Sequence, residues 1–242
     1  LIYLIDDGST DNSLKKLQQY EDKYDNVCVF HKENGGAASA RNYGIRKVQT
    51  EYLMFVDIDD YVEKEYVELL YQGIIENDAQ MCRCSSIWEG FRKSEEEMHR
   101  NEVVCVENSK EVLLQLGNVI WDKIYKTELF HKESIYFPEG IIYEDTATVI
   151  RIAARCRKIA FIPQPLYHYV ETEGSVMHMQ KTHFDDIFKV VECINNDGKR
   201  QEYQKEYEYF SYMIMMPFLG RFAIENQKAE RYQKICRYME QY

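Results

Sequence analysis

The sequence contains no long hydrophobic run. None of its apolar stretches approaches the roughly 20 residues that a membrane-spanning helix requires, and no signal peptide is visible. It also lacks a basic excess, since 41 acidic residues outnumber 30 basic ones and the net charge is −11. A protein that binds nucleic-acid backbone needs a basic surface, so nucleic acid is excluded as the main partner. We expect a cytoplasmic protein.

The cysteines lack a pattern that would indicate disulfides or metal binding. Their number, seven, is odd, and most lie in apolar surroundings, as Cys28 does in NVCVF and Cys156 in AARCRKI. Cys82 and Cys84 alternate on one predicted strand, so their side chains should point to opposite faces of a sheet. We interpret the cysteines as reduced core thiols, in keeping with a cytoplasmic compartment.

An internal repeat and a linker rich in proline, glycine and serine are also absent. With 242 residues, 45% of them apolar, the chain can bury one large core or two modest ones. We place the boundary near residue 180, so that residues 1–180 form an α/β domain and residues 181–242 form a helical C-terminal region. The chain starts inside a predicted strand, LIYLID, and we expect further sequence before Leu1.

Strands and helices alternate in the first part of the chain. The apolar runs LIYLID, VCVFH and YLMFVD predict three strands, and residues 14–24 and 37–48 between them follow helical patterns. This alternation predicts parallel βαβ units and a mostly parallel sheet, which binds ligands beyond the carboxyl ends of its strands. The loops DDGS, NGG and DIDD all follow such ends, so they should converge on one edge.

Farther along, the patterns predict helices at 63–77, 111–116 and from Glu144 onward, and strands at 79–87, 158–163 and 166–170. The charge-rich segment 89–102 reads as a solvated hairpin or loop.

Everything from His183 onward has a helical pattern. We expect Pro217 and Gly220 to divide the last helix in two, because proline removes a backbone donor and glycine is costly inside a helix. One apolar stripe recurs at helical spacing: Phe210, Met213, Ile214 and Phe218. We expect this stripe to pack on the α/β domain rather than to dock on a membrane or a partner, since the helix is acidic.

Three aspartates, Asp57, Asp59 and Asp60, close the third predicted strand. Like charges at the end of a buried strand repel unless a cation or a ligand lies between them. An EF-hand is unsuitable because Tyr61 and Val62 stand where that loop needs an oxygen ligand and a glycine. A helix cap needs one aspartate, not three. Three carboxylates suit a hard divalent cation held by one or two of them together with substrate phosphates.

Other candidate residues have both a chemical and a structural reading. Arg41, which follows NGG, could offset a phosphate charge or form a surface salt bridge. Glu144 and Asp145 could supply a general base or complement a helix macrodipole. Trp121 could be a sugar platform, although core packing is commoner, and His168 reads as a structural histidine.

Taken in order, the motifs LIDDGSTDNS, KENGGAASARNYG, EYLMFVDIDDYV, WDKIY, YEDTATVIRIA and PLYHYVETEGSV resemble those of a bacterial family-2 glycosyltransferase. The resemblance covers about residues 1–180. It implies a GT-A fold, which is α/β and Rossmann-like, a UDP-linked or other nucleotide-diphosphate sugar, and a divalent cation, Mn or Mg. It also implies inversion of the anomeric centre by direct displacement. The family's usual first strand and following helix are absent before Leu1.

The resemblance assigns roles in donor binding to individual residues. Asp7 of DDGS would contact the nucleobase, and Gly36 and Arg41 would lie along the nucleotide. Asp57 would touch the ribose or the metal. Two further assignments are Asp59 as the ligand of the metal that bridges the diphosphate, and Ser175 in a loop near the diphosphate.

On the reaction side, the resemblance implies that Asp145 is the catalytic base, with Glu144 beside it, and that Trp121 lies toward the acceptor. The acceptor would be a saccharide or a lipid-linked molecule of polysaccharide biosynthesis. The family usually has asparagine after the tryptophan, and Asp122 here would add negative charge near that acceptor. A peripheral contact with the inner face of the membrane or a homodimer contact would be compatible with these roles.

Two other functions remain open at the level of the sequence. A glycoside hydrolase could use Asp59 and Asp145 as its carboxylate pair, although DDGS and NGG would then have no role. The second is a non-catalytic module that binds a sugar nucleotide or a partner. Sugar release without metal would favour the hydrolase, and nucleotide binding without transfer would favour the module.

Overall fold

The computed structural model of the chain describes residues 1–90, 94–96, 101–171, 185–224, 233 and 236–237, without the side chains of 94–96 and 218–224. Within this part of the chain, no helix has both the length and the apolar character needed to cross a bilayer.

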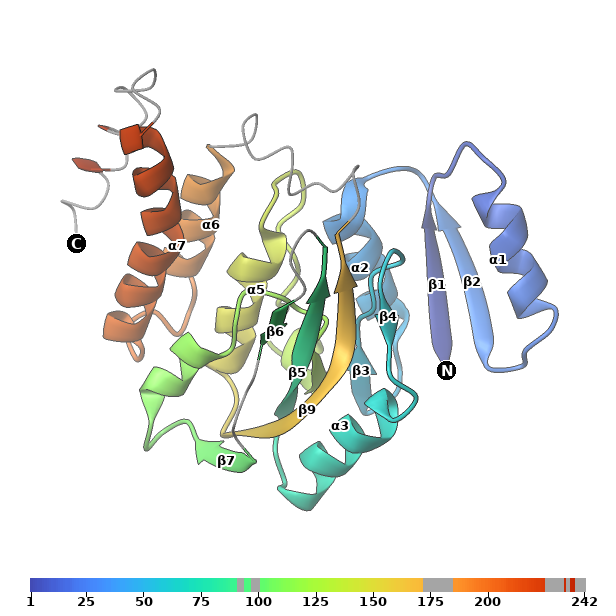
Figure 1. Ribbon diagram of the computed structural model, residues 1–242, viewed down its shortest axis with the longest axis horizontal. Coiled ribbons are helices and arrows are strands. Elements are labelled where there is room, and N and C mark those ends of the chain that lie inside the picture. Colours follow the sequence, from blue (N-terminus) through green and yellow to red (C-terminus); the bar gives the residue numbers. More distant parts are fainter. Residues whose placement is uncertain (91–93, 97–100, 172–184, 225–232, 234–235, 238–242) are drawn as a thin grey trace.

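The first part of the chain is a parallel βαβα unit, as predicted. It consists of β1 (Ile2–Asp7), α1 (Ser13–Glu21), β2 (Val27–Lys32) and α2 (Gly36–Lys47). β1 and β2 are parallel and pair from Ile2 with Val27 to Asp7 with Lys32. Both strands therefore end at the same edge, where the loops DDGS and NGG begin. Figure 1 shows this unit at one end of the molecule.

The remaining described strands form one mixed sheet. They are β3 (Tyr52–Met54), β4 (Tyr61–Val62), β5 (Met81–Glu89), β6 (Ser94–Glu96), β7 (Glu102–Cys105), β8 (Lys123–Lys126) and β9 (Lys158–Val170). Their order is β3-β8-β5-β9-β4, with β6 paired to β5 and β7 to β9.

The α/β class is confirmed, but the expectation of a mostly parallel sheet needs correction. In the described residues β1 pairs with β2 and β5 with β9 in parallel, and the other pairings are antiparallel. The chief reason is β8, which comes from the segment WDKIY and inserts between β3 and β5. This strand is short and its first three residues are all buried, so it has no alternation that could have revealed it.

Two predicted strand boundaries also differ. The strands expected at 158–163 and 166–170 are one strand, β9, because Pro165 falls where the register with β5 shifts, at a position where a ladder tolerates proline. The strand YLMFVD ends early, at Met54. The hairpin expected in 89–102 is present in part, since β6 pairs antiparallel with β5.

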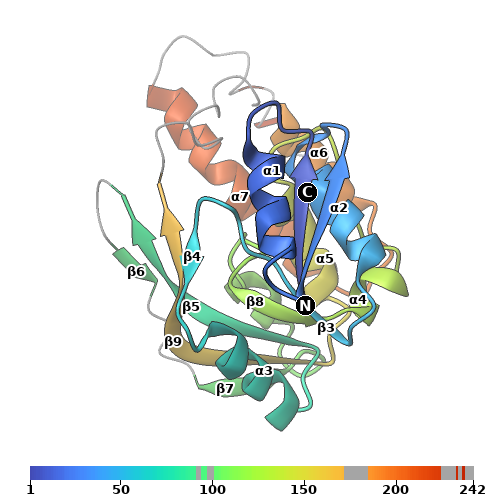
Figure 2. The ribbon, with the colours of Figure 1, turned by 90° about the vertical axis from the view of Figure 1, so that its right-hand side faces the viewer.

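The helices surround this sheet. They are α3 (Tyr66–Glu76), the 3-10 helix η1 (Lys110–Gln115), α4 (Glu128–His131), α5 (Glu144–Ala153), α6 (Asp186–Asn195) and α7 (Gln204–Ile224). α3 packs on β5 and β9, and α6 packs between α5 and α7. Figure 1 shows α6 and α7 at the end opposite β1. Figure 2 shows α3 below the strands β4, β5 and β9.

The C-terminal helices share the core of the α/β part. Ile187 and Tyr207 belong to the same buried cluster as Ile45. α7 runs unbroken through Pro217, so the expected division into two helices is wrong; packing on α6 holds the turns before the proline. The expected boundary near residue 180 lies in 172–184, outside the described residues, and the two-domain division stays a prediction.

The predicted apolar stripe of α7 is also partly wrong. Phe210 and Ile214 are buried, but 46% of Met213 is exposed. Phe218 lies outside the described side chains.

Candidate active site

Asp7 joins the first two strand-end loops. Its carboxylate accepts hydrogen bonds from Lys32 Nζ at 2.5 Å and from the backbone N–H groups of Gly35 at 3.1 Å and Gly36 at 2.6 Å. Partial burial would raise the pKa of Asp7, but Lys32 and the two amides outweigh it and lower that pKa. Asp7 is thus held as a carboxylate at the sheet edge, where we had placed a nucleobase contact.

Gly36 begins α2 in a backbone conformation that favours glycine. Its φ is +83°, and a Cβ added there would meet no atom within 4 Å. Backbone amides at the start of a 12-residue helix attract anions, and here the amides of Gly35 and Gly36 already donate to the carboxylate of Asp7.

Arg41, in α2, connects the two predicted catalytic segments. Its Nη2 lies 2.7 Å from Asp57 Oδ1, and its Nη1 lies 2.7 Å from Glu144 Oε1 and 2.9 Å from Asp145 Oδ1. The guanidinium also stacks over Phe137. Because the Arg41 side chain is 13% exposed, the surface salt bridge considered from the sequence is wrong, and the residue is the centre of a half-buried ion cluster. Its contact with a nucleotide stays a prediction.

Asp145 has the electrostatic character of a base. Burial raises its pKa to about 7, Arg41 opposes this rise, and the charges of Glu144 and Asp57 add to it. Its second oxygen, Oδ2, accepts a hydrogen bond from the Ile120 N–H at 3.3 Å. A carboxylate whose pKa lies near neutrality is well matched to proton transfer.

The residue before the acidic pair has a strained backbone. Tyr143 adopts a left-handed conformation with φ of +66°, which is unusual for a bulky side chain. α5 begins immediately after it, with Glu144 and Asp145 in its first turn, as predicted. The turn at Tyr143 fixes how this pair enters the helix, and such strain tends to occur at functional sites.

The three aspartates of DIDD have different surroundings. Asp57 is 31% exposed and bonds Arg41, whereas Asp59 is fully on the surface. Asp60 instead fixes the loop to β9: its Oδ2 accepts from the Tyr167 hydroxyl at 2.7 Å and its Oδ1 from the Val170 N–H at 2.8 Å. Burial is the main reason that the pKa of Asp60 is raised. The three aspartates therefore do not all face one ligand. Asp60 has a structural role, and this partly relieves the repulsion that the sequence predicted.

Tyr167 is a site residue that sequence reasoning missed. Besides its bond to Asp60, its hydroxyl oxygen accepts a hydrogen bond from the Asp57 backbone N–H at 3.1 Å. The signal in the sequence was weak, because the alternation in PLYHYV indicated a strand but not what its aromatic face would meet.

His168, on the opposite face, is the structural histidine that we expected: its ring faces Glu63 at 2.8 Å and Glu89 at 3.2 Å.

The carboxylates of DIDD fit a divalent cation only in part. Asp57 and Asp59 offer the hard oxygen ligands that Mg²⁺ and Mn²⁺ prefer. Among the described residues, however, no group of three or more His, Cys, Asp and Glu side chains is arranged to hold a metal. These two carboxylates could supply only part of the ligands of a divalent cation.

The charge of Asp122 does not face an acceptor, which corrects the expectation drawn from the sequence. Asp122 is completely buried, and it pairs with Arg83 Nε at 2.7 Å and with the buried Lys123. Burial lowers the pKa of Lys123, and Asp122 opposes this effect. Trp121 is also in the core, with 3% exposure, so its ring has no open face for a sugar.

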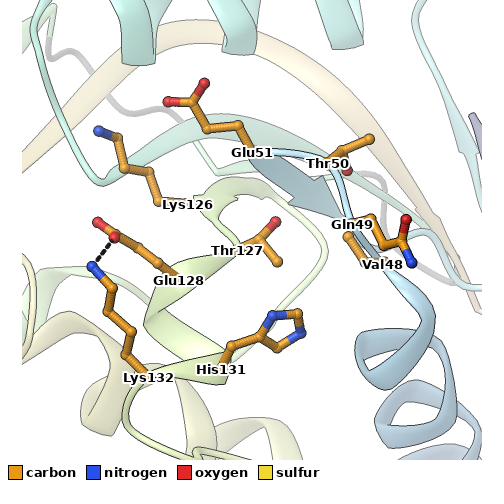
Figure 3. Close-up of a pocket in the computed structure, with 9 residues that line it drawn as sticks. All are labelled: Val48, Gln49, Thr50, Glu51, Lys126, Thr127, Glu128, His131 and Lys132. Atoms are coloured by element: carbon orange, nitrogen blue, oxygen red, sulfur yellow. Dashed lines mark hydrogen bonds and ion pairs between the residues drawn. The ribbon is translucent and has the colours of Figure 1, made fainter.

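Two further parts of the chain lie outside this cluster. Ser175 is outside the described residues, so its predicted place near the diphosphate stays a prediction. A separate pocket lies between the start of β3 and α4 (Figure 3). It is lined by Val48, Gln49, Thr50, Glu51, Lys126, Thr127, Glu128, His131 and Lys132, none of which is a predicted site residue.

Comparison with known proteins shows that the chain is a glycosyltransferase. The chain belongs to glycosyl transferase family 2, whose model matches residues 2–146. It is 34% identical over 219 residues to the glycosyltransferase GlyG of Streptococcus pneumoniae serotype 4. The aligned region covers 80% of this chain and 70% of GlyG. The resemblance seen in the sequence is thereby confirmed.

Two solved structures share the GT-A fold. S. aureus TarS (residues 1–349) in complex with UDP-GlcNAc has a TM-score of 0.69 at 24% identity, over 86% of this chain and 61% of that one. The mannosyltransferase PcManGT from Pyrobaculum calidifontis, in complex with GDP-Man and Mn²⁺, has a TM-score of 0.57 at 14% identity, over 92% of this chain and 65% of that one. The chain thus spans about two thirds of the length of the proteins it matches.

Proposed function

We propose that this protein transfers a sugar from a nucleotide-diphosphate sugar to an acceptor hydroxyl, with inversion at the anomeric carbon. The observation that carries the proposal is the Arg41 ion cluster. It brings Asp57 of the DIDD loop and Asp145 of α5 to the same guanidinium, although the two motifs are far apart in the sequence. In such a reaction the groups that bind the donor and the group that takes the proton must lie side by side. The cluster brings these groups together.

The donor would lie over the edge formed by Asp7 and the start of α2. Asp7, which already bonds the Gly36 N–H, would contact the nucleobase, and Gly36 and Arg41 would lie along the nucleotide. A UDP-linked donor is supported by the TarS complex with UDP-GlcNAc, while the PcManGT complex with GDP-Man keeps other nucleotides open. Ser175 would approach the diphosphate from the segment after β9.

Asp59 would hold a divalent cation, with Asp57 beside it, and the diphosphate would supply the remaining ligands. The surface position of Asp59 supports this assignment because it leaves room for such ligands. When bound, Mn²⁺ or Mg²⁺ neutralises charge on the diphosphate leaving group. Manganese in the PcManGT complex is in keeping with this choice.

Asp145 would act as the general base. Its carboxylate takes the proton of the acceptor hydroxyl while the hydroxyl oxygen forms a bond to the anomeric carbon. On the opposite face of that carbon the bond to the diphosphate oxygen breaks, and the diphosphate leaves with the bonding electrons. Arg41 and the Ile120 N–H hold the Asp145 carboxylate in place during this step. Glu144 would help to position Arg41.

The remaining parts of the proposal concern the cellular compartment, the acceptor and possible contacts with a membrane or a second copy. All seven cysteines are free thiols, which supports a reducing compartment such as the cytoplasm. The acceptor would be a saccharide or a lipid-linked molecule of polysaccharide assembly. A peripheral membrane contact or a homodimer contact is compatible with the outward Tyr209 and Met213 of α7.

The decisive experiment separates transfer from hydrolysis and from simple binding. Purified protein is screened for thermal stabilisation by UDP-GlcNAc, GDP-Man and other nucleotide sugars with Mn²⁺, because a ligand of the native state raises its stability. The donor that binds is then incubated with a panel of acceptors. Glycoside formation with inverted configuration supports the proposal. Binding without transfer to any acceptor points to a non-catalytic module, and metal-independent glycoside cleavage points to a hydrolase.

A further inference from the structure

Residues 119–122, between η1 and β8, belong to neither a helix nor a strand, although Ile120, Trp121 and Asp122 are buried. Their backbone carbonyl groups cannot be satisfied by a regular ladder, so they need other donors. Three of these carbonyl groups accept hydrogen bonds from side chains of the core: Val119 from Lys123 Nζ at 2.7 Å, Ile120 from the Tyr125 hydroxyl at 3.0 Å, and Trp121 from the Tyr66 hydroxyl at 2.5 Å. Two of the donors are therefore neutral hydroxyls, and one is an ammonium.

The ammonium of Lys123 and the carboxylate of Asp145 lie at opposite ends of one peptide group. The Val119 carbonyl and the Ile120 N–H belong to the same peptide, and a trans peptide points these two groups in opposite directions. Lys123 Nζ donates to the carbonyl, and the N–H donates to Asp145 Oδ2 at 3.3 Å. A positive charge at the carbonyl oxygen polarises the peptide, so its N–H becomes a stronger donor to the carboxylate.

Asp145 is thus held from two sides. Arg41 Nη1 bonds its Oδ1 at 2.9 Å, and the Ile120 N–H bonds its Oδ2. Donors on both oxygens fix the plane of the carboxylate, and the rate of a proton transfer depends on such orientation. The place of the Ile120 N–H is therefore part of what orients the proposed base.

Satisfying a buried carbonyl does not by itself explain why residue 123 is a lysine. Lys123 is 0% exposed, and burying an ammonium is costly unless a carboxylate such as Asp122 offsets the cost. The next two carbonyl groups of the segment need only neutral tyrosine hydroxyls. Of the three peptides, the one that receives the charged donor is the one whose N–H donates to Asp145.

We propose that Lys123 is a positioning residue for Asp145: through the Val119–Ile120 peptide it holds the Ile120 N–H against Asp145 Oδ2. The proposal rests on the proposed function in taking Asp145 as the base. Because Lys123 is fully buried, it does not touch the reacting molecules. Its effect on the reaction passes through the orientation of the carboxylate.

The contact can be measured without any substrate. In protein labelled with 15N-isoleucine, the Ile120 amide is assigned by its absence from the spectrum of Ile120→Val. Lys123→Met keeps a long side chain but removes the charge and the donor, so it should shift the Ile120 amide proton upfield. Exchange of this proton with solvent should become about tenfold faster relative to the other buried isoleucines. Asp145→Asn should also move this signal, because the carboxylate is its acceptor.

Tyr66→Phe is the matched control for this measurement. It removes a buried neutral donor from the same segment, at the carbonyl of Trp121, and leaves the Val119–Ile120 peptide untouched. The Ile120 amide of this variant should resonate where that of the wild type does.

Kinetics test the consequence for the reaction. With the substrates that the wild type uses, Lys123→Met should lower kcat about tenfold, while the donor KM stays within about twofold of the wild-type value. Lys126→Met removes another lysine of β8, at the pocket shown in Figure 3, and serves as the control for loss of one positive charge. It should keep the wild-type kcat.

A second variant is available if Lys123→Met does not fold. The double variant Asp122→Asn/Lys123→Gln removes two opposite charges together, so no buried charge is left without its partner. Glutamine offers the segment a neutral N–H donor in place of the ammonium. The double variant should show the same upfield shift of the Ile120 amide, by a smaller amount, and a lower kcat.

Two results would overturn the inference. One is an Ile120 amide that does not move in the folded variant of Lys123. The other is an unchanged kcat in a variant whose Ile120 amide has moved. Absence of sugar transfer by the wild type, with the Ile120 signal moving in both Lys123→Met and Asp145→Asn, would instead refute the proposed function and support the contact between the peptide and the carboxylate.

Discussion

Nη1 of Arg41 lies 2.9 Å from Oδ1 of Asp145, although the two residues are 104 positions apart in the chain. The same guanidinium holds Asp57, so one half-buried cation offsets the repulsion between carboxylates that lie close together. The contact joins the middle of α2 to the start of α5. Several consequences of this arrangement can be measured.

Replacing Arg41 should destabilise the fold as well as the reaction. Arg41→Ala leaves three carboxylates together without their cation, and in this half-buried cluster the loss should cost about 1–3 kcal/mol. The loss should be smaller at acidic pH, because burial raises the pKa of Asp145 to about 7 and this carboxylate then takes up a proton. Denaturant unfolding of the variant and the wild type at pH 5 and pH 8 measures this loss of stability. Arg46→Ala, an exposed arginine of the same helix, is the matched control, and equal effects of the two variants would contradict the cluster's importance.

Asp145→Asn should lower kcat by a factor of about 10² or more, because asparagine cannot accept the proton of the acceptor hydroxyl. Donor affinity should change little, since only the proton-transfer step is affected. Steady-state kinetics and a donor titration check the two quantities separately. If donor binding and turnover fell together, Asp145 would have a structural or metal-binding role.

The titration of Asp145 should be visible in the pH dependence of both activity and stability. Its pKa is raised by burial from 3.8 to about 7, so the carboxylate form, and with it kcat/KM, should increase as the pH rises through about 7. The stability of the fold should change with pH in the opposite direction. Between about pH 4 and pH 7 the folded protein binds more protons at this site than the unfolded chain, so the free energy of unfolding falls as pH rises. Asp145→Asn should remove this dependence, and pH-dependent unfolding of the two proteins tests it.

Two neighbouring aspartates should give contrasting variants. Asp59→Asn should abolish most transfer and the stabilisation by donor plus Mn²⁺, with the melting temperature of the free protein unchanged, because Asp59 lies on the surface. Asp60→Asn should lower that melting temperature, because it weakens the link to Tyr167 and Val170. Full turnover of the wild type in excess chelator would refute the metal assignment.

Asp122→Asn should be strongly destabilising, even though asparagine is the usual residue after the tryptophan in proteins that this sequence resembles. It removes the carboxylate that lies beside the fully buried Lys123 and also bonds Arg83, at a cost of about 3 kcal/mol or more. Because Lys123 can lose its proton, the destabilisation should shrink as the pH rises. Denaturant unfolding between pH 7 and pH 10 measures this trend, and an unchanged free energy of unfolding would show that the charge of Asp122 is not needed.

Local patterns were sufficient for much of the fold. Apolar runs followed by turn residues located β1 and β2, and the helical spacing located α1 and α2. The acidic pair Glu144–Asp145 was correctly placed in the first turn of α5. These features depend on neighbours a few residues away, which a single sequence displays directly.

Other features had no local signal. β8 is a short buried strand whose place between β3 and β5 depends on distant partners, so WDKIY could not reveal it. Phe55, the residue after the end of β3, packs against Phe130 and Phe137, which are remote in the chain. Similarly, Pro217 suggested a helix break, but tertiary packing on α6 kept α7 continuous.

The sequence by itself determined the α/β class, the family resemblance and the chemical types available at the strand ends, because these depend on local periodicity and on motif order. The tertiary structure alone decided which carboxylates share a cation. It assigned Asp60 to a structural bond with Tyr167, buried Asp122 between Arg83 and Lys123, and placed Arg41 between Asp57 and Asp145. An ion pair or a ring stack acts over a few ångströms in space, and residues that far apart in the chain carry no sign of it until the fold brings them together.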